Sequence, residues 1–392
     1  MSDIVIKFLK DIKNPLKSVL DAALEYKTDI ALWQEPDSQI IHLIIDFNGL
    51  SVLDIDGVIN NQAGFVISPF NYNKNTDLQL YLIKNQLHLS FKNNEISIVN
   101  EDNIPLDFIK KLNNNKNKNK NKNIILNTDK TPPINSNNFQ QNVAKAIDEI
   151  HQKKFKKVVL SVIHNKTITE NYDILAFFKR LCDQNPHNFV SLSITKKYGM
   201  WIGSSPEKLL SIKNNKKTSI FATAGTQEIT NNKDKIIWQK KEQQEQKFVV
   251  KYIQKILKKL KINYQTKKTK TLKIANIAHL KTAISFKIKH KNIIKLLQKL
   301  LPTPAVCGVP KKKAQEFIKN NEIHNRLLYA GCIGLLNLKS KYTLKLWTNI
   351  RCAKFTYKNA DVFAGAGIIS SSSIKDEIQE IDLKLKAILD FL

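Results

Sequence analysis

The chain contains almost no arginine. Of its 63 basic residues only Arg180, Arg326 and Arg351 are arginine, and the rest are lysine. Glycine is also scarce, with 11 residues in 392, and seven of these fall in short blocks at positions 203, 225, 308, 331, 334, 365 and 367. Only arginine offers a planar fork that holds a carboxylate or phosphate through two parallel hydrogen bonds. The remaining arginines and glycines therefore indicate a binding site for a carboxylate-bearing small molecule in the C-terminal two-thirds.

Paired cysteines and long apolar runs are absent as well. The four cysteines, at positions 182, 307, 332 and 352, form no close pair that would suggest a zinc or redox motif, so we expect reduced thiols. No apolar run approaches the roughly 18 residues of a membrane span, and the N-terminus does not resemble a signal peptide. We expect a cytoplasmic monomer without a membrane partner. A hydrophobic content of 42% can supply a substantial core.

Acidic residues are few, which leaves a formal net charge of +29. Such a charge would suit a nucleic-acid partner. However, the lysines are spread along the whole chain together with abundant asparagine, and the densest run (110–122) has no aromatic residue on which a base could stack. This pattern favours a solvated lysine and asparagine loop over a nucleic-acid-binding arm.

The order of predicted elements indicates an α+β protein. Asn14 and Pro15 can cap and start a helix that runs to residue 26. Runs rich in branched and aromatic residues predict strands at 30–34, 40–47, 64–67, 78–83, 87–91, 157–163, 189–194 and 198–202. Apolar spacing predicts helices at 139–150, 174–182, 236–260 and 373–391. We expect large, mainly antiparallel sheets in a layered sandwich with helices packed outside. Residues 1–128 should add strands to this fold and end in a Lys/Asn-rich loop (110–127).

Two predicted helices carry carboxylates where apolar residues are expected. At about 100° per residue, Glu242 and Glu245 fall within the apolar stripe of the helix at 236–260. In the last helix, Glu377, Glu380 and Lys384 form a stripe beside the apolar one. If the helices met, the two acidic pairs would form an oxygen cage of the kind that Mg²⁺ prefers. Nearby lysines could instead neutralise the first pair, and the second could be an exposed charged flank.

Eight short blocks follow one another through the C-terminal two-thirds. They are KKVVLS (156–161), GSSPE (203–207), AGT (224–226), AHL (278–280), PTPAVCGVP (302–310), RLLYAGCIG (326–334), IRCA (350–353) and FAGAGI (363–368). Each block alone is a weak signal. In this order they resemble the chorismate-utilising enzymes, most closely the isochorismate synthases. Residues 129–392 would then be the chorismate-binding catalytic region, and IALWQEP and GFVISPF resemble the opening strands of that family.

The resemblance implies a reaction in which chorismate loses its ring hydroxyl while water adds two carbons away. In that family the lysine of the KVVLS strand takes a proton from the water, and here it is Lys157. The glutamate of the SPE turn protonates the departing hydroxyl, and here it is Glu207. The lysine has to be partly neutral and the glutamate partly protonated, both of which burial favours.

The resemblance also implies a Mg²⁺ ion and a set of substrate contacts. Glu245 and Glu380 match the direct metal ligands, and Glu242 and Glu377 are expected nearby. The matching substrate-binding residues are Gly225 and Thr226 at the ring carboxylate, His279 near the ring, Tyr329 and Arg351 at the enolpyruvyl carboxylate, and Gly365, Gly367 and Lys384 around it. Arg326 is open to a structural or a binding role.

Four positions depart from the family pattern. Val162, Gln246, Leu301 and Asn325 stand where arginine, histidine, histidine and aspartate are usual, which puts the efficiency of the reaction in question.

Single positions separate the rival reactions. Ala224 replaces the nucleophilic lysine of one type of aminodeoxychorismate synthase, and anthranilate synthases generally lack the lysine that matches Lys157. Salicylate synthase, which goes on to eliminate pyruvate, shares Lys157 and Glu207 and remains an alternative. A decayed enzyme and a non-catalytic basic protein that binds nucleic acid are the alternatives from other classes. The PTPAVCG block favours menaquinone synthesis, and siderophore synthesis stays open.

Overall fold

The structure is a computed structural model that describes residues 9, 12, 14–53, 62–70, 78–93, 95–114, 136–170, 172–213, 217–229, 236–274, 277–289 and 292–392. Residues 115–127 of the predicted Lys/Asn-rich loop, and the predicted boundary at residue 128, lie outside the described residues. Residues 110–114 are not a loop, because they belong to the helix α3 (Leu106–Asn114). Phe108, Ile109 and Leu112 are buried, and this apolar face outweighs the low helix propensity of the asparagines.

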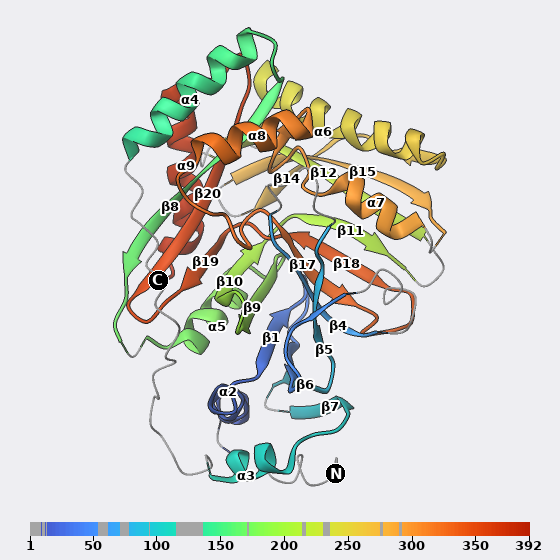
Figure 1. Cartoon of the computed structure of the whole chain (residues 1–392), viewed down its shortest axis with the longest axis vertical. Coiled ribbons are helices and arrows are strands. Elements are labelled where there is room, and N and C mark those ends of the chain that lie inside the picture. The colour runs from blue at the N-terminus through green and yellow to red at the C-terminus, as the bar shows by residue number, and fades with distance from the viewer. Residues whose placement is uncertain are drawn as a thin grey trace.

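Two large sheets form the body of the protein (Figure 1), and every strand pair among the described residues is antiparallel. The first sheet has ten strands in the order β16 (Gly308–Val309), β8 (Lys157–Thr167), β20 (Asn359–Ile368), β19 (Cys352–Phe355), β10 (Gly199–Ser205), β9 (Phe189–Thr195), β1 (Asp29–Gln34), β2 (Ile41–Asp46), β6 (Leu87–Lys92) and β7 (Glu95–Glu101). The N-terminal strands therefore pair directly with strands from the C-terminal two-thirds.

The second sheet runs β13 (Tyr264–Thr266), β15 (Ile277–Lys287), β12 (Lys217–Glu228), β11 (Lys208–Ile212), β18 (Leu344–Thr348), β17 (Cys332–Leu336), β4 (Gly64–Ser68), β5 (Tyr81–Lys84) and β3 (Ser51–Val52). A further strand, β14 (Lys270–Ile274), pairs with β15. The two sheets share a core, in which the rings of Phe189 and Trp347 stack with their centroids 3.9 Å apart.

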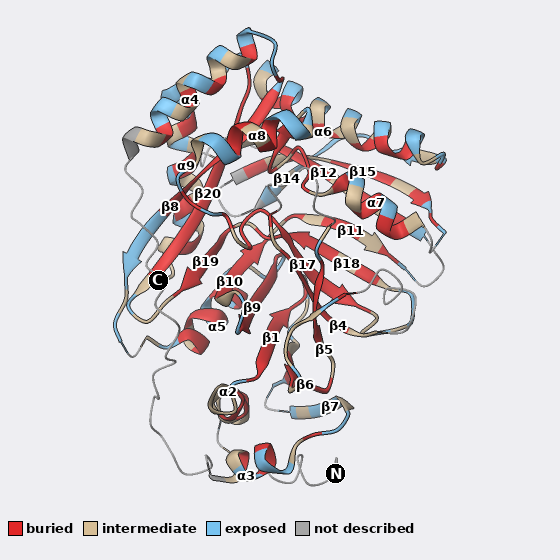
Figure 2. Cartoon of the chain, in the orientation of Figure 1, coloured by how far each residue is buried: buried red, intermediate tan, exposed pale blue. Residues whose placement is uncertain are grey.

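Helices pack on the outside of both sheets, and their buried faces point inward (Figure 2). They are α2 (Pro15–Glu25), α3, α4 (Ser136–His151), α5 (Ile174–Gln184), α6 (Lys240–Lys259), α7 (Ile293–Leu300), α8 (Lys311–Asn321) and α9 (Ile374–Leu389). Helices α4, α8 and α9 contact β8 or β20 of the first sheet, whereas α6 lies on β12 and β15 of the second. The predicted α+β sandwich is confirmed. No helix in these ranges is both long and apolar enough to cross a membrane.

Local sequence explains where key elements begin. Asn14 accepts a hydrogen bond from the backbone of Lys17, and Pro15 opens α2, as predicted. Ser373 caps α9 in the same way through the backbone amide of Asp376. The first seven residues of β8 are all buried, because this strand lies between β16 and β20 and is covered by α4 and α8.

Arg326 ties three segments together inside the protein. Its side chain is fully buried and donates to both carboxylate oxygens of Glu322, at 2.8 and 2.5 Å. It also donates to the backbone oxygens of Val306 and Val159, at 2.9 and 2.7 Å. The guanidinium thus joins the end of α8 to β8 and to the loop before β16. Its role is structural.

Replacing Arg326 with alanine should strongly destabilise the fold. The change would leave the buried Glu322 carboxylate and two backbone oxygens without their donors, at a cost of about 3–5 kcal/mol in the free energy of unfolding. Denaturant titration measures this cost. The exposed Arg180 is the matched control, and Arg180→Ala should cost less than about 1 kcal/mol. Equal losses for the two variants would contradict the structural role of Arg326.

Candidate active site

A cavity of about 770 Å³, open solvent at its mouth included, lies between the two sheets and the helices α6 and α9. Eleven of the fourteen residues predicted for the site line it: Glu207, Gly225, Thr226, Glu245, His279, Tyr329, Arg351, Gly365, Gly367, Glu380 and Lys384. The other three, Lys157, Glu242 and Glu377, are not among the lining residues.

A bulge in β12 forms one wall of the cavity. The pairing of β12 with β15 shifts between Ala224 and Thr226, and Gly225 takes a φ of +75°. A side chain at Gly225 would come within 2.8 Å of the Cβ of Glu242, so α6 packs directly on this glycine. The glycine thus meets two demands, a left-handed backbone and the close approach of a helix.

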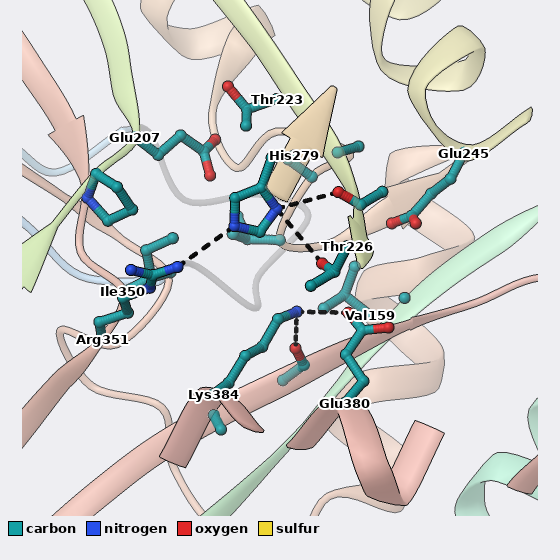
Figure 3. A pocket seen from close by; sticks show the side chains of 18 of the residues that line it. Val159, Glu207, Thr223, Thr226, Glu245, His279, Ile350, Arg351, Glu380 and Lys384 are labelled. Carbon is teal, nitrogen blue, oxygen red and sulfur yellow. Dashed lines mark hydrogen bonds and ion pairs between the residues drawn. The ribbon is translucent and has the colours of Figure 1, made fainter. Parts of the chain in front are cut away.

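His279 links this bulge to Arg351 (Figure 3). Its Nδ1 lies 3.0 Å from the carbonyl oxygen of Gly225, and its Nε2 lies 3.4 Å from Nη2 of Arg351. Burial, followed by the charges of Arg351 and Lys384, lowers the pKa of His279 to about 3, so the ring is neutral at physiological pH. We assign the proton to Nδ1, which donates to Gly225, and Nε2 accepts from Arg351.

Arg351 is a buried cation without an ion-pair partner among the described residues. Its side chain is almost fully enclosed, and its hydrogen bond goes to the neutral ring of His279. Burial lowers the pKa of Arg351 to about 10, which leaves it charged at neutral pH. The residue takes a φ of +50°, a conformation that non-glycine residues adopt at a cost. A buried guanidinium without an ion-pair partner in the described part of the chain is suited to an anionic ligand.

Tyr329 lies beside the same region and fixes the shape of the wall. Its ring stacks on Phe363 with the centroids 5.2 Å apart, and its hydroxyl would lie 2.7 Å from a Cβ at Gly365. Burial raises the pKa of Tyr329, so its hydroxyl remains protonated. Any side chain larger than hydrogen at position 365 would displace this hydroxyl.

Glu207 lies at the turn between β10 and β11 and is nearly enclosed. Thr348 donates to its Oε1 at 3.1 Å. Burial raises the pKa of Glu207 to about 7, although Thr348 and the charges of Lys157, Lys384 and Lys281 act in the opposite direction. The carboxyl group is therefore partly protonated at neutral pH and can donate a proton.

Lys157 lies one hydrogen bond behind the cavity wall. Its side chain is completely buried, and its Nζ donates to Oε1 of Glu245 at 2.7 Å. Gly367 makes room for this pair, because a Cβ there would lie 2.4 Å from the glutamate oxygen and 3.1 Å from Cε of the lysine. The ion pair joins β8 of the first sheet to α6, which lies on the second.

Two of the three glutamates that line the cavity come from helices, and each from a different one. Glu245 belongs to α6, and Glu380, from α9, accepts from Lys384 at 2.7 Å. Next to them, Glu377 is fully buried, and its Oε1 accepts from Lys241 at 2.7 Å. By hydrogen-bond geometry the second oxygen of Glu377 has no partner among the described residues, although the hydroxyl of Ser372 is close enough to act on the pKa of this carboxyl and lower it.

This donor set fits a hard divalent cation in chemistry but is not a closed cage. No group of three or more acidic, histidine or cysteine side chains in the described ranges is arranged as a ready metal site. Lysine ammonium groups instead supply the positive charge at Glu245, Glu377 and Glu380. Carboxylate oxygens are the ligands that Mg²⁺ prefers, and the orphaned oxygen of Glu377 lacks the partner that such an ion could provide.

Glu242, predicted to lie near the metal, caps the start of α6. Its carboxylate accepts from the backbone amide of Gln239 at 3.0 Å, as part of a capping box at the start of α6. Gln246, where the family usually has histidine, donates to the backbone of Ala222 and to Thr282, both at 3.0 Å. It therefore anchors α6 to β12 and β15.

Three polar residues around the site do not follow from the sequence patterns. Thr348 holds Glu207, Lys241 neutralises Glu377, and the positive charge of Lys281 acts on Glu207. Thr348 lies two residues before the block that contains Arg351, and this proximity is the one signal that could have found it. The two lysines cannot be distinguished by pattern among sixty.

Comparison with known proteins defines the family. The family model described as chorismate binding enzyme matches residues 60–392. The isochorismate synthase EntC of Escherichia coli (strain K12) is 28% identical over 261 residues, which cover 64% of this chain and 66% of EntC. The vibriobactin-specific isochorismate synthase of Vibrio cholerae is 25% identical over 261 residues, which cover 64% of this chain and 65% of that synthase. The matched part thus spans less than two thirds of the length of these relatives.

The fold is shared with a solved relative. The structure of MenF, the menaquinone-specific isochorismate synthase from Escherichia coli, superposes with a TM-score of 0.74 at 21% identity, over 94% of this chain and 91% of MenF. The family match extends from β4 to the end of the chain and includes every residue that lines the cavity. This chain therefore belongs to the chorismate-binding enzyme family.

Proposed function

We propose that the protein is an isochorismate synthase, which converts chorismate reversibly to isochorismate by adding water at C2 and expelling the C4 hydroxyl. One observation carries the proposal. A single cavity combines an unpaired buried cation, Arg351, with a carboxyl group that is partly protonated at neutral pH, Glu207. The first suits a carboxylate substrate and the second suits a hydroxyl leaving group.

The substrate would bind through its two carboxylates. Arg351 and the protonated hydroxyl of Tyr329 would be the donors for the enolpyruvyl carboxylate, because both groups are buried and line the cavity. Lys384 adds positive charge from α9, where its Nζ donates to the carbonyl oxygen of Gly365 at 2.8 Å. The ring carboxylate would then lie toward Gly225 and Thr226, near the acidic end.

The reaction needs one base and one acid from the protein, which act at two different carbons of the substrate ring. Lys157 does not line the cavity and donates to Glu245 in this structure, so in the proposed reaction it acts in its neutral form and beside Glu245. It takes a proton from water as the water oxygen bonds to C2, and the ring double bonds shift. The bond from C4 to its hydroxyl oxygen breaks, and Glu207 protonates that oxygen so that it leaves as water. Glu207 lies across the cavity from Glu245, the partner of Lys157 (Figure 3). This placement suits a base that acts at C2 and an acid that acts at C4.

Mg²⁺ is the cofactor we propose, held by Glu245 and Glu380 with Glu242 and Glu377 nearby. When bound, the ion would neutralise the ring carboxylate of the substrate. Support comes from the carboxylates that α6 and α9 direct to one cavity, and from the orphaned oxygen of Glu377. The product would serve menaquinone synthesis, a place that the PTPAVCG block supports.

Incubation with chorismate and Mg²⁺ should yield isochorismate without release of pyruvate. Lys157→Met and Glu207→Gln should each lower kcat at least about 100-fold, because each removes a proton-transfer group. Lys156→Met, at the exposed neighbouring lysine, is the matched control and should leave kcat unchanged. Chromatography of the products measures all three. Stoichiometric pyruvate and salicylate would favour a salicylate synthase, and full activity of either site variant would refute its assigned role.

The rate should depend on the protonation of Glu207. Because the protonated form donates the proton, kcat/KM should fall about tenfold per pH unit above pH 7, the value to which burial raises this pKa. The charge of Lys281 favours ionised Glu207, so Lys281→Gln should raise the pKa and move the fall to higher pH. A pH profile that Lys281→Gln leaves in place would argue against Glu207 as the acid.

Binding of Mg²⁺ should depend on the pocket carboxylates. Glu380→Gln removes one anionic ligand and should weaken Mg²⁺ binding at least about tenfold. Calorimetric titration with Mg²⁺ measures this without turnover. Asp382→Asn, an exposed acid on the same helix, is the control and should bind as the wild type does. If both variants bind Mg²⁺ like the wild type, the ion lies elsewhere.

A further inference from the structure

Thr223 lines the cavity but has no part in the reaction described above. It lies on β12, and its side chain is 7% exposed. Among the described residues, its hydroxyl oxygen has no hydrogen-bond partner. A buried hydroxyl without a partner is unfavourable, and such groups are uncommon in folded proteins. A hydroxyl left in this state at the wall of a binding cavity points to a partner supplied by the ligand.

Strand pairing brings Thr223 and the proton-donating acid to the same end of the second sheet. Thr223 pairs with Lys281 of β15, whose charge acts on Glu207. The pairing of β11 with β12 ends at Leu210 opposite Ile220, and Glu207 and Thr223 each lie three residues beyond this last pair, on the same side of it.

In the close-up view, Glu207 and Thr223 lie at the same end of the cavity, away from Glu245 and Glu380 (Figure 3). Thr348, the other threonine near the acid, already donates to Glu207. The hydroxyl of Thr223, which has no partner in the part of the chain that the structure describes, is therefore still available to a ligand at this end.

We propose that Thr223 is a specificity-determining residue, whose hydroxyl forms a hydrogen bond with the ring hydroxyl that Glu207 protonates. The inference rests on the proposed function, which brings that hydroxyl to Glu207. A threonine hydroxyl can both donate and accept, so it can hold the substrate oxygen while the oxygen takes up the proton. A site built to bind a hydroxyl in this way rejects ring compounds that lack it.

Two substitutions separate the hydroxyl from the shape of the side chain. Thr223→Val keeps the shape and removes the hydroxyl, whereas Thr223→Ser keeps the hydroxyl. Thr223→Val should lower kcat/KM for chorismate about tenfold, since one neutral hydrogen bond is lost. Its Tm without ligand should equal or exceed that of the wild type by about 2 °C, because an unpaired buried hydroxyl is gone. Thr223→Ser should stay within about threefold of the wild type.

Other results would overturn the proposal. Wild-type kcat/KM in Thr223→Val would show that the hydroxyl does not bind the substrate. A shift of the fall in kcat/KM above pH 7, with no loss at lower pH, would mean that Thr223 acts on Glu207 instead. The charged groups that act on that acid include Lys157, Lys281, Lys384 and Arg351, and all four are unchanged in both variants.

Thermal stabilisation by chorismate distinguishes this inference from the proposed function. Chorismate should raise the Tm of the wild type and of Thr223→Ser more than that of Thr223→Val, whether or not it is converted. If the wild type binds chorismate but makes no isochorismate, the proposed function fails and this comparison still decides the role of Thr223. Equal stabilisation of all three proteins overturns the inference, and a wild type that chorismate does not stabilise overturns both.

Discussion

The ion pair between Lys157 and Glu245 is the contact on which the site depends. It joins β8 of the first sheet to α6 on the second at 2.7 Å, with the lysine completely buried. Gly367 admits the pair because any side chain there would overlap the carboxylate. A buried charge that lost its partner would destabilise the fold by about 3–5 kcal/mol. The two sheets, the small residues of β20 and the position of α6 are therefore coupled through one hydrogen-bonded pair.

Around this pair the cavity separates its charges. Arg351 and Lys384 provide positive charge for an anion, while burial keeps Glu207 partly protonated and His279 neutral. Carboxylates from α6 and α9 occupy the other end. A dianionic ring with a hydroxyl group matches this division, since each of its polar groups meets a side chain of suitable charge or proton content. The same reasoning underlies the proposal for Thr223, whose hydroxyl has no hydrogen-bond partner within the described ranges.

Much of this arrangement can be predicted from the sequence, because it depends on local patterns. Asn14 and Pro15 start α2 as expected, and the carboxylates within or beside apolar stripes point to Glu245 and Glu380, which both line the cavity. The roles of these acids, and of Lys157 and Glu207, remain predictions.

Partners distant along the chain cannot be predicted in this way. The capping role of Glu242, the lysine that neutralises Glu377 and the threonine that holds Glu207 depend on how the backbone and the elements pack. The helix at residues 110–114 could not be predicted for a different reason: the apolar face of α3 ends within a run of lysines and asparagines that is typical of a loop.

The central claim is that the cavity activates a water molecule on one side of a chorismate ring and releases a hydroxyl on the other. The most direct test is the reaction of chorismate in ¹⁸O-labelled water with Mg²⁺, followed by mass spectrometry of the isochorismate formed at early times. The account predicts one ¹⁸O atom in the product, at C2. Isochorismate that carries only the original oxygen would mean that the hydroxyl migrates without exchange with water, and would contradict the roles given to Lys157 and Glu207.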